Sequence, residues 1–433
     1  MQLYESYKPS DAAWLGNVPS HWDVKPLRAV TSLKSDKNRP DLPVLSVYRE
    51  YGVILKDSRD DNHNATSLDT SNYKVVKPGD LVVNKMKAWQ GSMGVSSHQG
   101  IVSPAYITCT TKADRVRPAY LHYLLRSSPL IGVYNSLSYG VRVGQWDMHY
   151  EDFKQIPIPL PPKDEQDRIV AFLDQKTAEI DAAIVKKERL IELLNEQRST
   201  QVNRAVTLGM DQSVSLRKSE SEWIESLPDH WEIVPLKHIS TVQSGVTLGK
   251  NYASSKTTKS FPYLRVANVQ DGYIDLSTVT EIVLPVHEAK NYLLRTGDIL
   301  VTEGGDIDKL GRGNCWDGQI EECLHQNHVF AVRILKRVRP EFVALITGVS
   351  YARRYFTTTA NKTTNLASTN KTKLGNLPVL VPPLPEQDAI LDFCNGVKAQ
   401  YEALISSVTS EISALKEMKS SLVSDAVTGR IKV

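Results

Sequence analysis

The feature that most constrains this chain is an internal duplication that runs along nearly its whole length. Residues 14–30, WLGNVPSHWDVKPLRAV, align with residues 223–239, WIESLPDHWEIVPLKHI. Four further pairs follow in the same order: KPGDLVV (77–83) with RTGDILV (295–301), RVRPAYLHYLL (115–125) with RVRPEFVALIT (337–347), IPIPLPPKDEQDRIVAF (156–172) with LPVLVPPLPEQDAILDF (377–393), and RAVT (204–207) with DAVT (425–428). The offset between partners changes only from 209 to 222 residues. Collinear matches of this kind predict one globular domain and one helix, written twice.

Length and composition limit the class of protein. A chain of 433 residues has room for two to four domains. Hydrophobic residues make up 41% and charged residues 23%, which is typical of globular proteins. No apolar run reaches the roughly 18 residues of a membrane-spanning helix, and the N-terminus lacks the basic and apolar pattern of a signal peptide. We therefore expect a cytoplasmic protein.

The charge is unevenly distributed. The net charge of +3 divides into +5 for residues 1–163, −2 for 164–207, +2 for 208–385 and −2 for 386–433. The predicted globular segments are thus mildly basic and the predicted helical segments mildly acidic. This balance permits nucleic-acid binding by the globular segments but does not establish it.

Each globular segment mixes strands with short helices. Apolar and β-branched runs predict strands at Leu42–Tyr48, Leu81–Val83 and Ile101–Thr110, and again at Tyr263–Val269, Ile299–Thr302 and Val329–Leu335. Pro118 and Pro340 each stand at the first turn of a short helix, where a missing N–H is tolerated. The pattern predicts an α+β fold for each segment.

A diproline precedes each long helical pattern. Proline fixes φ and biases the preceding residue toward extended structure, so IPIPLPP is predicted to be extended. The helix then begins at Lys163 or Asp164, with acidic side chains in its first turn that the helix dipole favours. In the second copy Pro385, Glu386 and Asp388 occupy the corresponding turn.

Both helical segments carry a heptad pattern over roughly 40 residues, or about 60 Å of helix. In the first segment Val170, Thr177, Ile184 and Ile191 recur seven apart, and in the second Glu411 interrupts one of the two apolar series. The positions predicted to form the core are Leu173, Ile180, Ile184, Ile191 and Leu194 in the first segment and Val397, Tyr401, Leu404, Val408, Leu415 and Leu422 in the second.

A period of 3.5 residues over this length predicts a coiled coil. The two helices can pair within the chain or between chains, and we prefer an antiparallel pair within the chain. Two separate helices that each pack on their own domain are the alternative. The predicted domains are residues 1–160, 161–210, 211–382 and 383–433, with the helical regions second and fourth.

The sequence lacks the motifs of several chemistries. It contains no [DNS]-P-P-[YFW] tetrapeptide, no phosphate-binding G-x-x-x-x-G-K-[ST] and none of the common zinc-hydrolase or serine-hydrolase motifs. Cys315, Cys323, His325 and His328 are close in sequence but include no Cys-x-x-Cys pair, and we interpret them as a loop that enters a strand. We predict no catalytic residue and no metal site.

Two segments that open W-x(4)-P-x-H-W, end in PP-x-x-EQ-x-x-I and lead into a long helix ending AVT resemble the specificity subunit of type I restriction–modification enzymes. The resemblance covers nearly the whole chain. It implies two target recognition domains, each reading one half of an asymmetric bipartite DNA site. It also implies that the antiparallel coiled coil sets the spacer and docks two methyltransferase subunits, and that restriction (motor and nuclease) subunits join the complex. S-adenosylmethionine, ATP and Mg are then expected on those partners rather than on this chain.

Candidate DNA contacts lie in loops after strands, where basic side chains meet phosphates and amides read bases. The first copy offers two stretches, 84–94 and 139–147, and the second offers 304–316 and 359–371 at the corresponding places of the repeat. The candidates are Lys85, Lys87, Gln90, Arg142, Gln145, Lys309, Arg312, Asn314, Lys362, Thr364 and Asn365. Trp89 and Trp146 are interpreted as packing residues, and Trp22 and Trp231 as core.

Two rival hypotheses remain. The first is a coiled-coil adaptor that binds proteins without reading DNA. The second is a DNA-binding fragment of a larger fused methyltransferase and nuclease, which the initial Met1 and the end of the chain five residues after the second AVT make less expected. A bipartite sequence preference in the assembled complex would separate the specificity subunit from the adaptor.

Overall fold

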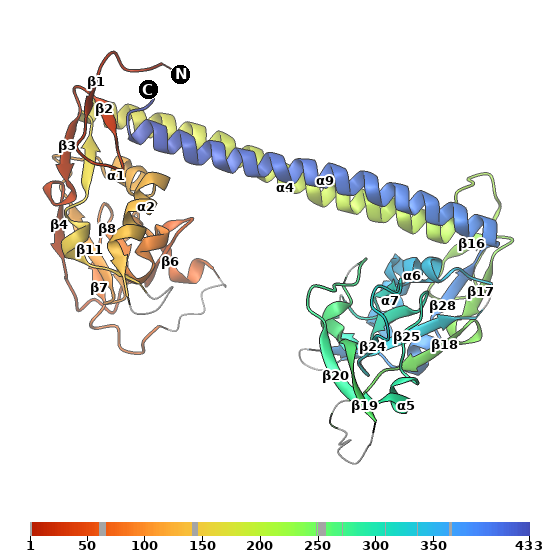
Figure 1. Cartoon of the computed structure of the whole chain (residues 1–433). Helices are drawn as coiled ribbons and strands as arrows, with labels where there is room; N and C mark the ends of the chain where they lie inside the picture. Colours follow the sequence, from red (N-terminus) through yellow and green to blue (C-terminus); the bar gives the residue numbers. More distant parts are fainter. Residues whose placement is uncertain are drawn as a thin grey trace. The chain divides into compact units, whose positions relative to one another are not determined.

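The computed structural model describes residues 2–59, 66–140, 146–247, 249, 257–270, 272–307, 309–335, 337–362 and 366–433. The chain forms two compact units (Figure 1): unit 1 comprises residues 1–189 and 408–433, and unit 2 comprises residues 190–407. Each unit therefore contains one globular domain, the start of one long helix and the end of the other. This division follows from the duplication, because the second helix returns to the first domain.

The central sheets of the two units have the same topology. Unit 1 has the antiparallel order β4–β11–β8–β9 and unit 2 the order β18–β25–β21–β23. The strands are β4 (Thr31–Lys34), β11 (Tyr106–Thr111), β8 (Leu81–Asn84), β9 (Met93–Val95), β18 (Ser240–Ser244), β25 (Val329–Ile334), β21 (Ile299–Thr302) and β23 (Gly313–Cys315). In both sheets the GD dipeptide of the repeat precedes a strand that begins with three apolar residues, β8 or β21, and this strand occupies an interior position.

Smaller strand pairs complete the domains. Unit 1 adds β1 (Tyr7–Pro9) with β2 (Asn17–Pro19), β5 (Leu45–Tyr48) with β6 (Gly52–Leu55), and β7 (Lys74–Val76) with β10 (Gly100–Val102). Unit 2 adds β15 (Leu216–Lys218) with β16 (Ser226–Pro228), and a sheet of β20 (Thr280–Pro285), β19 (Thr258–Leu264) and β24 (Leu324–His325). Only the β19–β24 pair is parallel among these sheets of the described residues.

Two strand predictions are wrong in detail. The segment predicted as one strand at Ile101–Thr110 is two strands, β10 and β11, because the turn at Pro104 and Ala105 interrupts the backbone pairing. The strand predicted at Tyr263–Val269 ends at Leu264, and Val266–Asn268 form a 3₁₀ turn that the Asn268 side chain caps. A polar side chain that bonds nearby backbone competes with the sheet ladder in such places.

Short helices pack on each central sheet. The predicted helices are α1 (Pro118–Leu125) and α6 (Pro340–Gly348), and each begins at its proline. Each is followed by a helix that was not predicted, α2 (Ser128–Leu137) and α7 (Ser350–Thr359). Two further short helices, α3 (Tyr150–Phe153) and α8 (Lys371–Gly375), precede the proline-rich strands.

The proline-rich segments are edge strands that lead directly into the long helices. In unit 1, β14 (Pro157–Leu160) pairs with β3 (Asp23–Pro26); in unit 2, β28 (Pro378–Val381) pairs with β17 (Glu232–Pro235). Each forms a two-stranded sheet, where proline is tolerated because one edge needs no N–H donors. The long helices follow as α4 (Lys163–Leu208) and α9 (Leu384–Val427).

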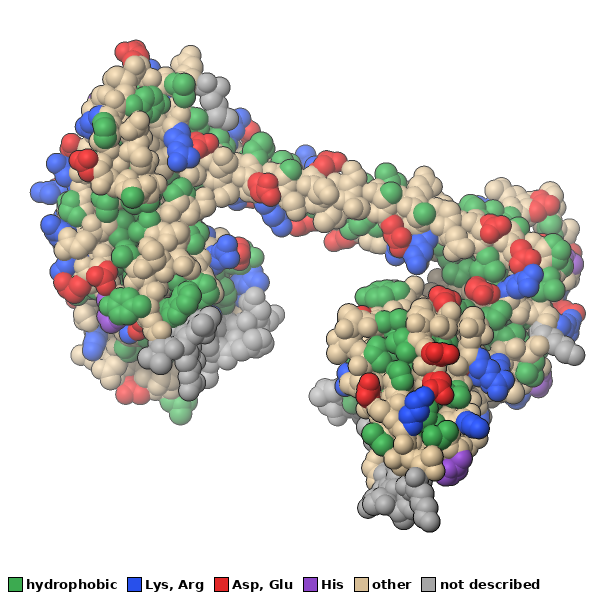
Figure 2. All heavy atoms as spheres, viewed as in Figure 1, with side chains coloured by type: hydrophobic (Ala, Val, Ile, Leu, Met, Phe, Trp, Pro, Cys, Tyr) green, Lys and Arg blue, Asp and Glu red, His purple; other side chains and the backbone are tan. Residues whose placement is uncertain are grey.

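The two long helices pair antiparallel, as predicted, and lie side by side in Figure 1. In unit 1 the Lys419 ammonium lies 2.6 Å from Asp181, and Lys187 pairs with Glu411. In unit 2 the Gln201 amide donates to the Tyr401 hydroxyl at 2.8 Å. Successive residues along α4 thus contact residues of decreasing number in α9. Figure 2 shows acidic and basic side chains interspersed along the pair.

The predicted seam of the coiled coil is wrong at one position. Leu173, Ile180, Ile184, Val397, Tyr401, Val408 and Leu422 are buried, and Ile191, Leu194 and Leu415 are half-buried. Leu404, however, is 44% exposed, and the contact side continues through Ile405 and Ile412 instead. In a strict heptad, the contact positions of a helix alternate between steps of three and four residues. On α9 the step of four from Val397 to Tyr401 is followed by another step of four, from Tyr401 to Ile405, where the heptad would have a step of three. A helix of 3.6 residues per turn drifts relative to a strict heptad, and such a step realigns it.

Each long helix ends on a glycine with positive φ that faces a tryptophan of the repeat. Gly209, after α4, has φ +78°, and a Cβ there would meet the Trp231 ring at 3.2 Å. Gly429, after α9, has φ +76°, and a Cβ there would meet the Trp22 ring at 3.1 Å and lie closer still to Pro19. Beyond it, the N–H of Lys432 donates to the carbonyl of Gln2 at 2.9 Å. In unit 1 the two ends of the chain therefore meet, in the place that the continuous segment 209–216 occupies in unit 2.

Candidate functional site

The two candidate loops of unit 1 come together. The loop after β8 forms a 3₁₀ helix, η3 (Lys85–Gln90), beside the hairpin of β12 (Ser138–Tyr139) and β13 (Asp147–Met148). The Lys85 ammonium lies 2.9 Å from the Asp147 carboxylate. The rings of Trp89 and Trp146 meet edge to face with centroids 5.3 Å apart, so these tryptophans pack the loops together.

The polar candidates of unit 1 differ in availability. Lys87 is exposed, and Gln90 is half-buried at the end of η3. The Lys85 ammonium is paired with the Asp147 carboxylate, so it is less available to a DNA phosphate than the Lys87 ammonium. Arg142 and Gln145 follow β12 and precede β13 in the sequence and lie outside the described residues.

The corresponding loops of unit 2 also come together, through backbone pairing. The first loop contributes β22 (Gly304–Gly305), which pairs with β27 (Ala367–Ser368) of the second loop, and β27 pairs in turn with β26 (Asn361–Lys362). The hairpin β26–β27 is the counterpart of β12–β13. Lys362 is exposed, whereas Thr364 and Asn365 lie outside the described residues.

Three candidates of unit 2 lie in the first loop and its strand. Lys309 is exposed and pairs with Asp306 at 2.5 Å, and Arg312 is half-buried. Asn314 is a correction: it lies in β23 with 8% exposure, and its amide donates to the carbonyl of Gln270 at 2.7 Å. A buried amide that satisfies a backbone carbonyl stabilises the fold, so Asn314 is a packing residue in this structure.

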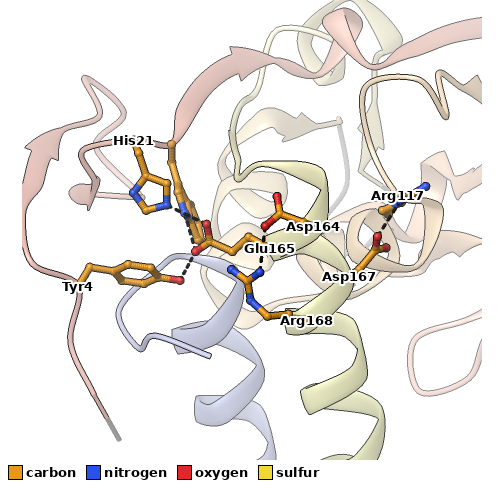
Figure 3. Close-up of polar contacts among 8 residues, drawn as sticks. Tyr4, His21, Arg117, Asp164, Glu165, Asp167 and Arg168 are labelled. Carbon is orange, nitrogen blue, oxygen red and sulfur yellow. Dashed lines mark hydrogen bonds and ion pairs between the residues drawn. The ribbon is translucent and has the colours of Figure 1, made fainter.

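A glutamate carboxylate joins each domain to its long helix. Glu165, in the first turn of α4, accepts hydrogen bonds from Tyr4, from the Nε1–H of Trp22 at 3.1 Å, and pairs with Nε2 of His21 at 2.8 Å. We call these four residues the Glu165 cluster. Figure 3 shows Tyr4 and His21 pointing toward the carboxylate, whereas Arg117 and Asp167 pair apart from it. The Glu165 side chain is only 5% exposed, and burial together with this hydrogen bond raises the pKa of Tyr4.

Unit 2 repeats this arrangement in the Glu386 cluster, which comprises Glu386, His230 and Trp231. The carboxylate pairs with Nε2 of His230 at 2.6 Å and accepts from the Nε1–H of Trp231 at 2.8 Å. The Glu386 side chain is 41% exposed, so this cluster is more open than its counterpart. The residue pairs HW and EQ recur in both copies, and their joint recurrence was the signal that could have predicted the contact.

The glutamine after each glutamate bonds to backbone groups of the same junction. The Gln166 side-chain oxygen accepts from the N–H of Arg117 at 2.7 Å, and its amide donates to the carbonyl of Pro161 at 2.8 Å. Gln387 makes the corresponding bonds to Arg339 and Pro382, both at 2.7 Å. The Glu-Gln pair of each copy therefore bonds to three other segments that recur in both copies: HW, RVRP and PP.

The cysteine thiols are largely buried, and the described residues also bear on whether the chain can hold a metal ion. Burial raises the pKa of the thiols of Cys109, Cys315 and Cys323 to about 12 and that of Cys394 to about 11, so the reactive thiolate is disfavoured. No group of three or more His, Cys, Asp or Glu side chains in the described part of the chain is arranged to hold a metal ion. None of the described helices is long and apolar enough to cross a membrane.

Comparison with known proteins finds a family that matches this chain. A family model described as "Type I restriction modification DNA specificity domain" matches residues 19–193 and again residues 228–411. The EcoKI specificity subunit of Escherichia coli K12 is 21% identical over 96% of this chain and 90% of its own length. The StySPI specificity subunit of Salmonella potsdam is 22% identical over the same shares. The two matched segments contain the HW, RVRP and EQ residues described above.

Solved structures share the fold. A chain from "Structural basis underlying complex assembly and conformational transition of the type I R-M system" superposes with a TM-score of 0.70 at 16% identity, over 96% of this chain and 99% of that one. The HsdS subunit from Thermoanaerobacter tengcongensis superposes with a TM-score of 0.52 at 17% identity, over 96% and 98%. At these identities the likeness concerns the fold.

Proposed function

Because the chain belongs to the family of type I restriction–modification specificity subunits, we propose that each globular domain reads one half of an asymmetric bipartite DNA site. The observation that carries this proposal is the pairing of two loops in each unit: η3 with β12–β13 in unit 1, and β22 with β26–β27 in unit 2. The loops occupy equivalent positions of the repeat but differ in sequence. Different side chains on one scaffold are what two different half-sites require.

Within each unit the candidates divide by role. Exposed Lys87, Lys309 and Lys362 are suited to contacts with phosphates, which hold the domain in register on the duplex. We assign base reading to Arg142, Gln145, Thr364 and Asn365, because arginine and amide side chains match the base edges of the major groove.

We assign spacing and docking to the paired helices. Several aliphatic side chains on them face solvent: Val185 and Met418 in unit 1, and Leu190, Leu193 and Leu404 in unit 2. We assign these side chains to the contact with another protein. The duplicated helix starts suit two copies of one partner, the methyltransferase subunit, and restriction subunits then join the complex.

In this proposal the chain itself is non-catalytic. S-adenosylmethionine, ATP and Mg bind to the partner subunits, in agreement with a sequence that contains no phosphate-binding loop and no amino-methyltransferase tetrapeptide. The complex acts on DNA in the cytoplasm.

The test is methylation of a random DNA library by this chain assembled with its methyltransferase subunits, followed by sequencing of the modified sites. We expect one bipartite motif with a fixed spacer. Exchange of residues 1–160 for the first domain of another specificity subunit should change one half of the motif and leave the other half unchanged. An assembled complex that methylates without a bipartite preference would favour a protein-binding adaptor.

A further inference from the structure

We propose that Glu165 and Glu386 are positioning residues for DNA reading: each carboxylate fixes the orientation of its domain on its helix, so that its loss degrades one half-site only. This inference rests on the proposed function. It concerns residues that lie outside the candidate recognition loops and that need not touch DNA.

The first argument is connectivity. In unit 1, β14 leads into α4 through Pro161 and Pro162, and β3 pairs with β14. His21 and Trp22 stand immediately before β3, and their bonds to Glu165 close a ring that comprises β3, β14 and the first turn of α4. Closing this ring opposes rotation of the domain about the diproline. The same ring in unit 2 comprises β17, β28 and α9, closed by Glu386.

The second argument is the place of the tryptophan. Trp22 and Trp231 are fully buried. Each bonds the carboxylate at the start of one long helix and faces the glycine at the end of the other, Gly429 or Gly209. One side chain therefore contacts both helix termini of its unit, and the carboxylate sets where that side chain lies.

The third argument is precision. Recognition requires side chains held to about 0.5 Å and 10–20° of their productive geometry. A small rotation of a whole domain exceeds this tolerance while its core stays packed. Selectivity at one half-site should therefore fall before the chain unfolds.

The two clusters should not be equally sensitive. Glu165 has three side-chain partners and is 5% exposed, whereas Glu386 has two and is 41% exposed. Water can replace a lost bond at the open cluster more readily than at the closed one. Loss of Glu165 should have the larger effect.

The experiment compares Glu165→Gln with Glu386→Gln in the assembled methyltransferase complex, using the same random-library methylation. Matched controls are Asp167→Asn and Asp388→Asn, which remove the exposed pairs with Arg117 and Arg339 beside each cluster. Base selectivity in the half-site of unit 1 should fall roughly tenfold in Glu165→Gln, with a smaller loss in the other half-site for Glu386→Gln. Both controls should retain the motif of the unaltered protein.

A second pair covers the case in which Glu165→Gln does not assemble. His21 is half-exposed, so His21→Ala removes one partner without opening the core, and His21→Gln restores a donor to the carboxylate. Selectivity should fall in the first variant and recover in the second. Equal loss at both half-sites, or lower thermal stability with unchanged selectivity, would overturn the inference. If the complex of the unaltered protein methylates DNA without any bipartite motif, the proposed function itself is refuted.

Discussion

At the scale of single residues, Gln166 and Gln387 show why a polar side chain is retained in a buried junction. Gln166 is 1% exposed and Gln387 is fully buried. Each bonds a backbone N–H at the start of a short helix and a carbonyl of the diproline, groups that no regular element satisfies. Replacing such a residue leaves two buried backbone groups without partners.

We therefore expect Gln166→Ala to lower the free energy of unfolding by about 2–4 kcal/mol, since each unsatisfied buried group costs about 1–3 kcal/mol. Urea denaturation of the free chain measures this loss. Gln175→Ala, on the exposed side of α4, is the control and should change stability by less than about 0.5 kcal/mol. Similar losses in both variants would show that the junction does not depend on Gln166.

His122 makes stability depend on pH. Burial, and next the charge of Arg126, hold its pKa at about 4, below the ordinary value near 6.5. Between these values the unfolded chain binds a proton that the folded chain excludes, so stability falls as the pH falls. Lowering the pH from 7 to 5 should cost about 2 kcal/mol through this residue. His122→Leu should reduce the pH dependence of urea unfolding, and an unchanged dependence would contradict this account.

Lys87 is an exposed cation in the first candidate recognition loop. If it contacts a phosphate, Lys87→Ala should lower the slope of log affinity against log salt by about one, with little change in the preferred sequence. Binding of the complex to its selected site at several salt concentrations measures the slope. Lys186→Ala, on α4, should leave the slope unchanged, and a Lys87 variant with an unaltered slope would exclude the contact.

At the scale of elements, the register of the helix pair depends on the step of four residues at Tyr401–Ile405. Ile412 is 8% exposed, whereas Leu404 is 44% exposed. We expect Ile412→Ala to destabilise the free chain by about 2–3 kcal/mol, because it removes buried methyl groups. Leu404→Ala should cost less than about 0.5 kcal/mol. Thermal unfolding, monitored by circular dichroism, compares the two variants. A larger loss of stability in Leu404→Ala than in Ile412→Ala would show that the seam follows the strict heptad.

At the scale of the whole molecule, the antiparallel pair means that a change of length must be made in both helices. Four residues inserted between Lys187 and Ile191, with four more between Val408 and Glu411, add about 6 Å of helix, or roughly two base pairs of DNA. An insertion of four residues realigns a helical seam without breaking it. The selected sites should then carry a longer spacer, and an unchanged spacer would contradict the role of the helices in spacing.

The periodic parts of the chain were predictable. The bounds of β8 and β21 and the starts of α1 and α6 agree with the predictions to within a few residues, because apolar pattern and proline position act locally. The helices α2 and α7 were not predicted, since tertiary contacts stabilise helices that local signals do not mark. The paired loops were predicted as equivalent positions, but only the fold shows that η3 meets β12–β13 and that β22 pairs with β27.

The sequence by itself determined that this molecule is one module written twice, with an extended diproline segment, an acidic helix start and a long amphipathic helix in each copy. These features depend on backbone preference and periodicity, which short segments carry. Only the tertiary structure decided that the Glu of EQ bonds the His and Trp of HW, that Asn314 is buried, and that the seam passes Ile405 rather than Leu404. Those outcomes depend on which distant side chains share a space, and that is settled by packing.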